Sequence, residues 1–235
     1  RDIEPFLTLN HWDIPQVFLE KGGWTNRDCI QHFLDYTDIV SSEYGDRVKF
    51  WVTHNEPWVI SNCGYKEGIH APGESDVYKS LVVNHNLLVS HGEAVPIIRK
   101  NAVDSKVGIV LNLTPGMPAS QSNADQKASK LFNQFFNEWF LDPLYGGVYP
   151  TEVSDDWIKK EVINSIDFVE EGDYEIISVP TDFLGINYYS RGIIRSEDIP
   201  ESENLPIEII SGDKTDFDWE VYPNGLRDLL IDVHN

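Results

Sequence analysis

The sequence predicts an α/β fold built on a parallel β-sheet. Short segments of almost continuous apolar residues recur along the 235-residue chain, and segments with helical periodicity lie between them. Strands of a parallel sheet are covered on both faces, so they are apolar throughout and do not alternate with polar residues. This order of strands and helices therefore favours a parallel sheet over an antiparallel one.

Four segments are expected to form buried strands. Each is a short apolar run rich in β-branched or aromatic residues, and they are Phe6–Asn10, Phe50–Thr53, Val107–Leu111 and Phe183–Asn187. None of these runs leads into a G-x-G-x-x-G or G-x-x-x-x-G-K loop, which are the phosphate-binding turns of common nucleotide-binding folds. The sequence therefore argues against a nucleotide-binding domain.

Five helices are expected between and after these strands. The first runs from Thr25, a suitable N-cap residue, to Tyr44, with apolar residues three to four positions apart. The second, Leu81–Ile98, contains Pro96, which should kink it. The other three are Ala128–Phe140, Glu152–Ile166 and Tyr222–Val233. The polar stretch Glu197–Asp218 is expected to be a surface excursion.

The charge balance excludes several classes of partner. Lys and Arg total 18 against 39 Asp and Glu, which gives a formal net charge of −21. Such an excess of negative charge argues against binding to a nucleic-acid backbone or an anionic membrane. No apolar run approaches the roughly 20 residues of a membrane span. A neutral small-molecule ligand remains compatible with this composition, and the oligomeric state is left open.

Cysteine usage and the chain ends suggest a cytoplasmic protein and an incomplete chain. Cys29 and Cys63 have no metal-type spacing, and we expect two free thiols in a reducing compartment. The chain opens at Arg1 without an initiator Met, and it closes at Asn235 within an apolar helical pattern that lacks a cap. We therefore expect it to be a piece of a longer protein.

Polar and aromatic side chains follow all four predicted strands. The segments NHWD, HNEPW, NLT and NYYSR stand at the strand ends and begin at Asn10, His54, Asn112 and Asn187. The carboxyl ends of parallel strands meet at one edge, which in a β/α barrel is the catalytic face. Amide, imidazole and phenol groups can pair with sugar hydroxyls, while an aromatic plane packs against the C–H face of a pyranose. We expect a carbohydrate site at this edge.

Several stretches resemble glycoside hydrolase family 1, the β-glucosidase and β-galactosidase group. LTLNHWDIPQ and WVTHNEPW resemble its third and fourth barrel strands, and GYKEGIHAPG the loop that follows. FLDPLYGGVYP, DFLGINYYSR and WEVYPNGLRDLL resemble the region up to the seventh strand. The resemblance covers nearly the whole chain in order. It implies a (β/α)8 TIM barrel of which residues 1–235 hold about four βα units. These residues would form an incomplete single catalytic domain that lacks the first two and last two strands.

The same resemblance implies a retaining hydrolase with two carboxylates about 5–5.5 Å apart. Glu56 matches the acid/base, a half-buried carboxyl that protonates the glycosidic oxygen and later activates water. The nucleophile belongs to an Ile-Thr-Glu-Asn-Gly motif, which this chain does not contain. No metal and no cofactor are implied. The alternative for Glu56 is a structural role in a capped turn after the strand.

Three residues match the part of the family's site that holds the sugar. Asn55 matches the residue that bonds the 2-hydroxyl, and His11 matches a binder of the 3-hydroxyl. Trp12 lies in the same rim. For His11 the alternative is a core histidine whose hydrogen bonds are satisfied within the protein.

Three further residues match the rest of the site. Tyr189 corresponds to the tyrosine that holds the nucleophile in place, and Asn187 lies beside it. Trp58 would face the aglycone. Asn187 could equally tie the strand to a loop.

The remaining tryptophans and four of the remaining histidines are not assigned to the site. Four tryptophans are expected to be packing residues: Trp24, Trp51, Trp139 and Trp157. Four histidines show no metal-ligand spacing: His32, His70, His85 and His91. Two positions depart from the family, namely Asn10 in place of an aromatic residue and His54 in place of Phe or Leu.

The expected function is hydrolysis of terminal β-D-glucosyl residues from β-glucosides or cellobiose-like oligosaccharides. The alternatives are a 6-phospho-β-glycosidase of the same family, a non-catalytic fragment, and a barrel enzyme of another chemistry. Half a barrel leaves strand edges unpaired, so we expect the 235 residues alone to be inactive and prone to aggregation.

Overall fold

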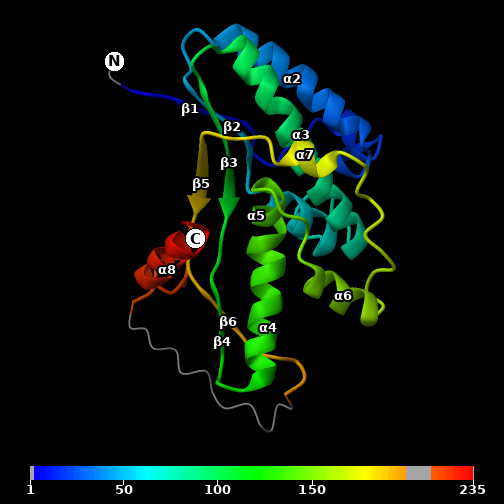
Figure 1. Ribbon diagram of the computed structural model, residues 1–235, viewed down its shortest axis with the longest axis vertical. Coiled ribbons are helices and arrows are strands. Elements are labelled where there is room, and N and C mark those ends of the chain that lie inside the picture. The colour runs from blue at the N-terminus through cyan, green and yellow to red at the C-terminus, as the bar shows by residue number, and fades with distance from the viewer. Residues whose placement is uncertain (1–2, 200–212, 235) are drawn as a thin grey trace.

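The computed structural model describes residues 3–199 and 213–234, and its centre is a four-stranded parallel sheet (Figure 1). The spatial order is β1-β2-β3-β5. The strands are β1 (Phe6–Asn10), β2 (Phe50–Asn55), β3 (Lys106–Asn112) and β5 (Phe183–Asn187). All four predicted strands are confirmed to within two residues, because each is a local apolar run that only a covered parallel sheet can bury.

A second, two-stranded parallel sheet was not predicted. It pairs β4 (Gly116–Pro118) with β6 (Gly192–Ile194), and these short strands follow β3 and β5 in the chain. Figure 1 shows them beyond the carboxyl ends of the main strands. The small sheet therefore extends the molecule on the side where the site was expected.

Helices connect the strands and cover the sheet. The α-helices are α1 (Gln16–Leu19), α2 (Asp28–Tyr44), α3 (Val77–Asn101), α4 (Asn123–Asn133), α5 (Trp139–Leu144), α6 (Thr151–Lys159), α7 (Asp173–Ile177) and α8 (Pro223–His234). A 3₁₀ segment and two π-helical segments complete the set: η1 (Gly23–Thr25), η2 (Val59–Lys66) and η3 (Gln134–Glu138).

Helix α3 is the central helix of the covering layer. It packs against α2 on one side and against β2 and β3 on the other, as Figure 1 shows. The Asp76 side chain caps its start by accepting a hydrogen bond from the Lys79 N–H at 3.0 Å. The helix continues through Pro96 to Asn101, so the proline lies inside it and does not end it. Pro96 has no backbone N–H, so α3 lacks one hydrogen bond there. Burial of the helix on nearly every side stabilises it in spite of this loss.

Three helix predictions need correction. The first helix begins at Asp28 with Arg27 at its N-cap, because Thr25 belongs to η1 and its hydroxyl donates to the Gly22 carbonyl. The third runs as α4, η3 and α5 over residues 123–144, longer than predicted, because the Ser122 side chain caps it early at the Asp125 N–H. The fourth ends at Lys159, short of Ile166, because Glu161 takes a left-handed φ of 57°. The polar stretch Glu197–Asp218 lies largely outside the described residues.

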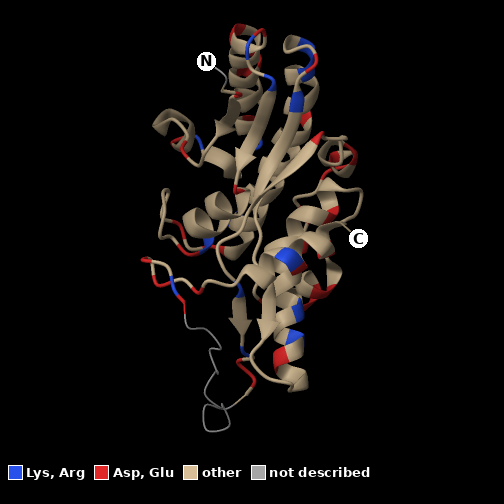
Figure 2. Cartoon of the chain, turned by 90° about the vertical axis from the view of Figure 1, so that its left-hand side faces the viewer, with Lys and Arg blue, Asp and Glu red and all other residues tan. Residues whose placement is uncertain are grey.

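The hydrophobic core confirms most of the predicted packing residues. Trp24, Trp51 and Trp139 are buried, and Trp157 packs partly buried against the core. Cys29 and Cys63 are both free thiols, as expected, and both are buried. Acidic side chains are spread over the surface and outnumber the basic ones (Figure 2).

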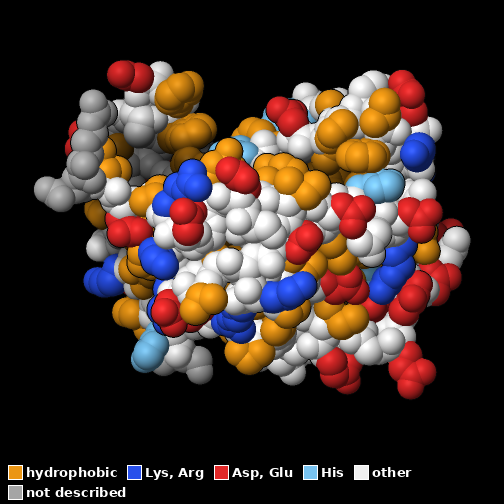
Figure 3. Space-filling view, turned by 90° about the horizontal axis from the view of Figure 1, so that it is seen from above, with side chains coloured by type: hydrophobic (Ala, Val, Ile, Leu, Met, Phe, Trp, Pro, Cys, Tyr) orange, Lys and Arg blue, Asp and Glu red, His pale blue; other side chains and the backbone are white. Residues whose placement is uncertain are grey.

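The outer strands β1 and β5 each have one edge without a neighbouring strand among the described residues. Phe6 of β1 is 59% exposed. Seen from above, apolar side chains reach the surface at several separate places (Figure 3). Within residues 3–199 and 213–234, no helix is long and apolar enough to span a bilayer.

Candidate active site

Five predicted site residues meet at the carboxyl end of the main sheet and form one hydrogen-bonded chain. Asn187 donates from Nδ2 to Asn55 Oδ1 at 3.1 Å and to Glu56 Oε1 at 2.7 Å. The Tyr189 hydroxyl donates to the same Glu56 oxygen at 2.7 Å. At the other end, Asn55 Nδ2 lies 3.3 Å from His11 Nε2. Residues at the ends of β1, β2 and β5 are therefore joined in one polar cluster.

Glu56 is held in an uncommon backbone conformation. It follows β2 directly, has a φ of 50°, and donates its N–H to the Val110 carbonyl of β3 at 2.8 Å. A left-handed conformation is uncommon for residues other than glycine, and it costs about 1–3 kcal/mol where the surroundings enforce it. Glu56 is only 3% exposed, so it is buried and not half-buried as predicted. The backbone turn directs the carboxyl into the polar cluster.

Tyr189 contributes a hydroxyl that stays protonated. Burial of the ring oxygen, followed by the hydrogen bond to Glu56, raises the pKa of Tyr189 to about 12. The residue as a whole remains 50% exposed, and its ring packs edge-on against Trp219 with ring centroids 5.3 Å apart. Tyr189 therefore acts as a hydrogen-bond donor at the mouth of the cluster.

Trp12 lies beside the cluster, in a turn that the sequence did not predict. The Asn10 side chain accepts the Trp12 N–H at 3.0 Å, and Trp12 has a φ of 82°. Its ring is 5.1 Å from that of His11 and 5.5 Å from that of His70. Asn10, which departs from the family pattern, thus forms a side-chain turn, a common role of asparagine.

Trp58 is separated from the hydrogen-bonded chain. Its ring packs against Phe136 with centroids 4.4 Å apart, which places it next to η3. Its indole nitrogen, like that of Trp12, is buried and has no hydrogen-bond partner among the described residues. The core residues Trp24 and Trp139 have the same unpartnered indole nitrogen, so this feature by itself does not mark a ligand site.

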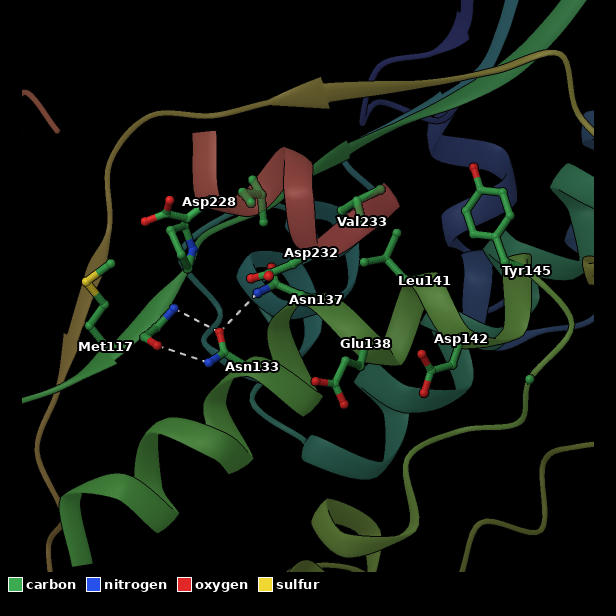
Figure 4. Close-up of a pocket in the computed structure, with 14 residues that line it drawn as sticks. Met117, Asn133, Asn137, Glu138, Leu141, Asp142, Tyr145, Asp228, Asp232 and Val233 are labelled. Atoms are coloured by element: carbon green, nitrogen blue, oxygen red, sulfur yellow. Dashed lines mark hydrogen bonds between the residues drawn. The ribbon is translucent and has the colours of Figure 1, made fainter. Parts of the chain in front are cut away.

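Two larger cavities, of about 660 and 590 Å³, contain no residue of the cluster. The one of about 590 Å³ lies between the α4–α5 region and α8 and is shown in Figure 4. It is lined by four carboxylates: Glu138, Asp142, Asp228 and Asp232. Burial raises the pKa of Glu138 and Asp142. A smaller cavity of about 310 Å³ borders Trp12 and His70. Only the smaller cavity contains a predicted site residue.

No group of three or more His, Cys, Asp or Glu side chains in the described parts of the chain is arranged to hold a metal ion. His85 belongs instead to a buried network, in which it bonds Asp173 at 2.7 Å and the Tyr149 hydroxyl at 2.9 Å. His91 bonds Thr53 at 2.7 Å. Both histidines therefore take part in buried hydrogen bonds within the protein.

Comparison with known proteins identifies the family. The sequence pattern of glycosyl hydrolase family 1 matches residues 1–235. The chain belongs to glycosyl hydrolase family 1. Beta-glucosidase A of Acetivibrio thermocellus is 42% identical over 231 residues, which are 97% of this chain and 51% of that protein. A 6-phospho-beta-glucosidase of Bacillus subtilis is 36% identical, over 98% of this chain and 51% of its own length.

A solved structure supports the same assignment for this family 1 chain. A beta-glucosidase from Exiguobacterium marinum superimposes with a TM-score of 0.91 at 36% identity, over 99% of this chain and 52% of that one. The chain therefore spans about half the length of the relatives it matches. Its four-stranded sheet is part of a (β/α)8 barrel, which confirms the predicted fold class.

Proposed function

We propose that the complete protein containing these residues is a retaining β-glycosidase that releases terminal β-D-glucosyl residues from β-glucosides or cellobiose. Residues 1–235 would supply the central strands of a single catalytic domain. The observation that carries the proposal is the buried Glu56 carboxyl, bonded by Asn187 and Tyr189 at the end of a parallel strand. The relatives named beta-glucosidase support the substrate class.

In this proposal Glu56 is the acid/base. Its Oε1 accepts two hydrogen bonds, whereas no described residue bonds Oε2. An oxygen that already accepts two donors is the poorer site for a proton, so the proton of the acid form belongs on Oε2. That oxygen would donate to the glycosidic oxygen as the bond breaks, and would later take a proton from the attacking water.

The nucleophilic carboxylate would come from the part of the protein outside residues 1–235. Tyr189 was predicted to hold that nucleophile, and in this chain its hydroxyl bonds Glu56. Because half of its surface is exposed, Tyr189 can also face a second carboxylate across the site.

The remaining residues would bind the sugar. Asn55 and His11 are already linked at 3.3 Å, so their polar groups face one region, where they would receive the 2- and 3-hydroxyls. The aromatic planes would come from Trp12 on the sugar side and Trp58 on the aglycone side.

A 6-phospho-β-glucosidase is the second candidate, because the Bacillus subtilis relative is named as one. The excess of negative charge acts against a phosphorylated substrate. The test is to assay the purified complete protein with an aryl β-glucoside and with its 6-phosphate. We expect turnover of the unphosphorylated substrate. Separately, we expect the complete protein to be cytoplasmic. Preference for the 6-phosphate would select the second candidate.

Glu56→Gln provides the test of the acid/base. We expect kcat/KM for an unactivated aryl glucoside to fall by about 10²–10⁴, the usual contribution of general acid–base catalysis. The matched control is Glu152→Gln, an exposed glutamate of α6 that bonds Lys130. Equal activity of the two variants would contradict the assignment. The isolated 235-residue chain is expected to show no turnover above the Glu56→Gln background.

A further inference from the structure

The strand that carries Glu56 contains an irregularity just before the residue. Val52 of β2 pairs with Gly108, but Asn55 pairs with Val110. Three steps along β2 therefore match two steps along β3, which is the pattern of a β-bulge. A bulge places two consecutive side chains on the same side of a sheet, whereas a regular strand alternates them.

The contacts show which side chains share a side. Thr53 and His54 both reach α3: Thr53 Oγ1 lies 2.7 Å from His91 Nδ1, and His54 Nε2 lies 2.8 Å from Ser90 Oγ. The next two residues, Asn55 and Glu56, both reach the polar cluster at the strand ends instead. Thus two consecutive side chains point toward the helix, and the next two point toward the cluster. A regular strand would alternate them, so this order requires both the bulge and the left-handed φ of Glu56.

The two bonds to α3 are fully buried. Thr53, His54, Ser90 and His91 each have 0% exposure. The Ser90 hydroxyl donates its proton to the Leu87 carbonyl at 2.8 Å, so its oxygen accepts the N–H of His54. Breaking such a pair leaves a buried donor without a partner, which costs more than an exposed bond.

The histidines also pack tightly and remain uncharged. The His54 ring stacks on Phe33 with centroids 4.5 Å apart and meets Trp24 edge-on. Burial holds the pKa of His54 well below its ordinary value and lowers that of His91 to about 3. Both contacts are therefore unchanged over the pH range in which a glycosidase works.

We propose that Ser90 and His91 of α3 are positioning residues for Glu56. They hold His54 and Thr53 on the helix side of the bulge, so that Asn55 and Glu56 emerge toward the sugar. The proposal rests on the proposed function of Glu56 for its catalytic consequence, but its structural content stands independently. None of these four residues touches the site cluster directly; they act through the backbone of β2.

The catalytic test compares substrates that differ in their need for a proton. In the complete protein, Ser90→Ala and Thr53→Val should lower kcat/KM for phenyl β-glucoside about tenfold or more. The value for 2,4-dinitrophenyl β-glucoside, whose leaving group needs no acid, should fall markedly less, because it keeps only the loss caused by displacing Asn55. Thr53→Ser, which keeps the hydroxyl, should restore the phenyl glucoside rate. The matched control is Ser154→Ala, a buried helical serine of α6 that bonds only backbone carbonyls.

Equal losses for both substrates would show a general structural effect and overturn the positioning role. Crystal structures of the Ser90→Ala and Thr53→Val variants give a readout that needs no activity. We expect the register shift between Val52 and Asn55 to change and the Glu56 carboxyl to leave Asn187. Unchanged Glu56 contacts in both variants would overturn the proposal, whereas an inactive wild-type protein would refute the proposed function alone.

Discussion

At the scale of single residues, one oxygen of Glu56 receives two donors. Asn187 and Tyr189 each lie 2.7 Å from Oε1, and Asn187 also bonds Asn55. A hydrogen bond to a charged group is worth about 1.5–3 kcal/mol, roughly twice a neutral one. The amide of Asn187 therefore bonds two proposed site residues at once.

This arrangement leads to a prediction for Asn187→Ala in the complete protein. Removing the shared donor should lower kcat/KM for aryl β-glucosides about 10- to 100-fold, because about 1.4–2.8 kcal/mol of positioning is lost. Steady-state kinetics measures the effect. Asn86→Ala is the control, since Asn86 is an asparagine outside the cluster that donates to the Trp24 carbonyl at 2.9 Å. A loss no larger than that of the control would argue against this role.

At the scale of elements, the backbone of helix α3 at Gly92 lies directly against the backbone of α7 at Ile176. An added Cβ at Gly92 would lie 2.0 Å from the Ile176 carbonyl oxygen and 2.6 Å from its carbon. No real side chain tolerates such a contact with backbone. The glycine therefore lets α7 lie directly on the central helix, in a place where sequence periodicity predicted no element.

Gly92→Ala should consequently destabilise the fold. Forcing the two helices apart is expected to lower the free energy of unfolding by about 1–3 kcal/mol, the usual cost of overpacking a core. Urea denaturation of the complete protein measures it. Gly192→Ala serves as a comparison, since its added Cβ would meet only side-chain atoms, of Ile194 at 3.3 Å and of Phe132 at 3.5 Å. Equal stability of the two variants would contradict the close packing of α3 and α7.

At the scale of the whole molecule, three buried histidines make stability depend on pH. Burial lowers the pKa of His54, His85 and His91, for His91 to about 3. Hydrogen bonds from Arg27 and His85 outweigh burial and hold the pKa of Asp173 below its ordinary value. These histidines stay neutral in the folded protein but take up protons once unfolding exposes them. The unfolded chain therefore binds more protons than the folded protein as the pH falls.

The sign of this effect sets the pH window. An unfolded histidine binds a proton below about pH 6.5, so the stabilisation is fully present above that pH. Each buried histidine then lowers the free energy of unfolding by up to about 1.4 kcal/mol per pH unit as the pH falls. Denaturation at pH 7.5 and pH 5 measures the loss, at high ionic strength to screen repulsion between acidic groups. Equal stability at the two pH values would refute it.

Much of the site could be predicted from local sequence. The four strands are apolar runs, and polar residues follow each of them, so parallel pairing alone brings His11, Asn55, Glu56, Asn187 and Tyr189 to one edge. The family match added roles for these residues. Burial of Trp24, Trp51 and Trp139 was likewise a local expectation.

Other features depend on partners that are distant in the chain. The bulge in β2 exists only relative to β3 and is pinned by α3, so no pattern within residues 50–56 reveals it. The left-handed turn at Glu56, the short helix α7 and the β4–β6 sheet arise in the same way. Local residue types decide which segments are buried and where polar groups stand along the chain. The direction in which each polar group points is decided by register and packing, because these depend on contacts between segments far apart in sequence.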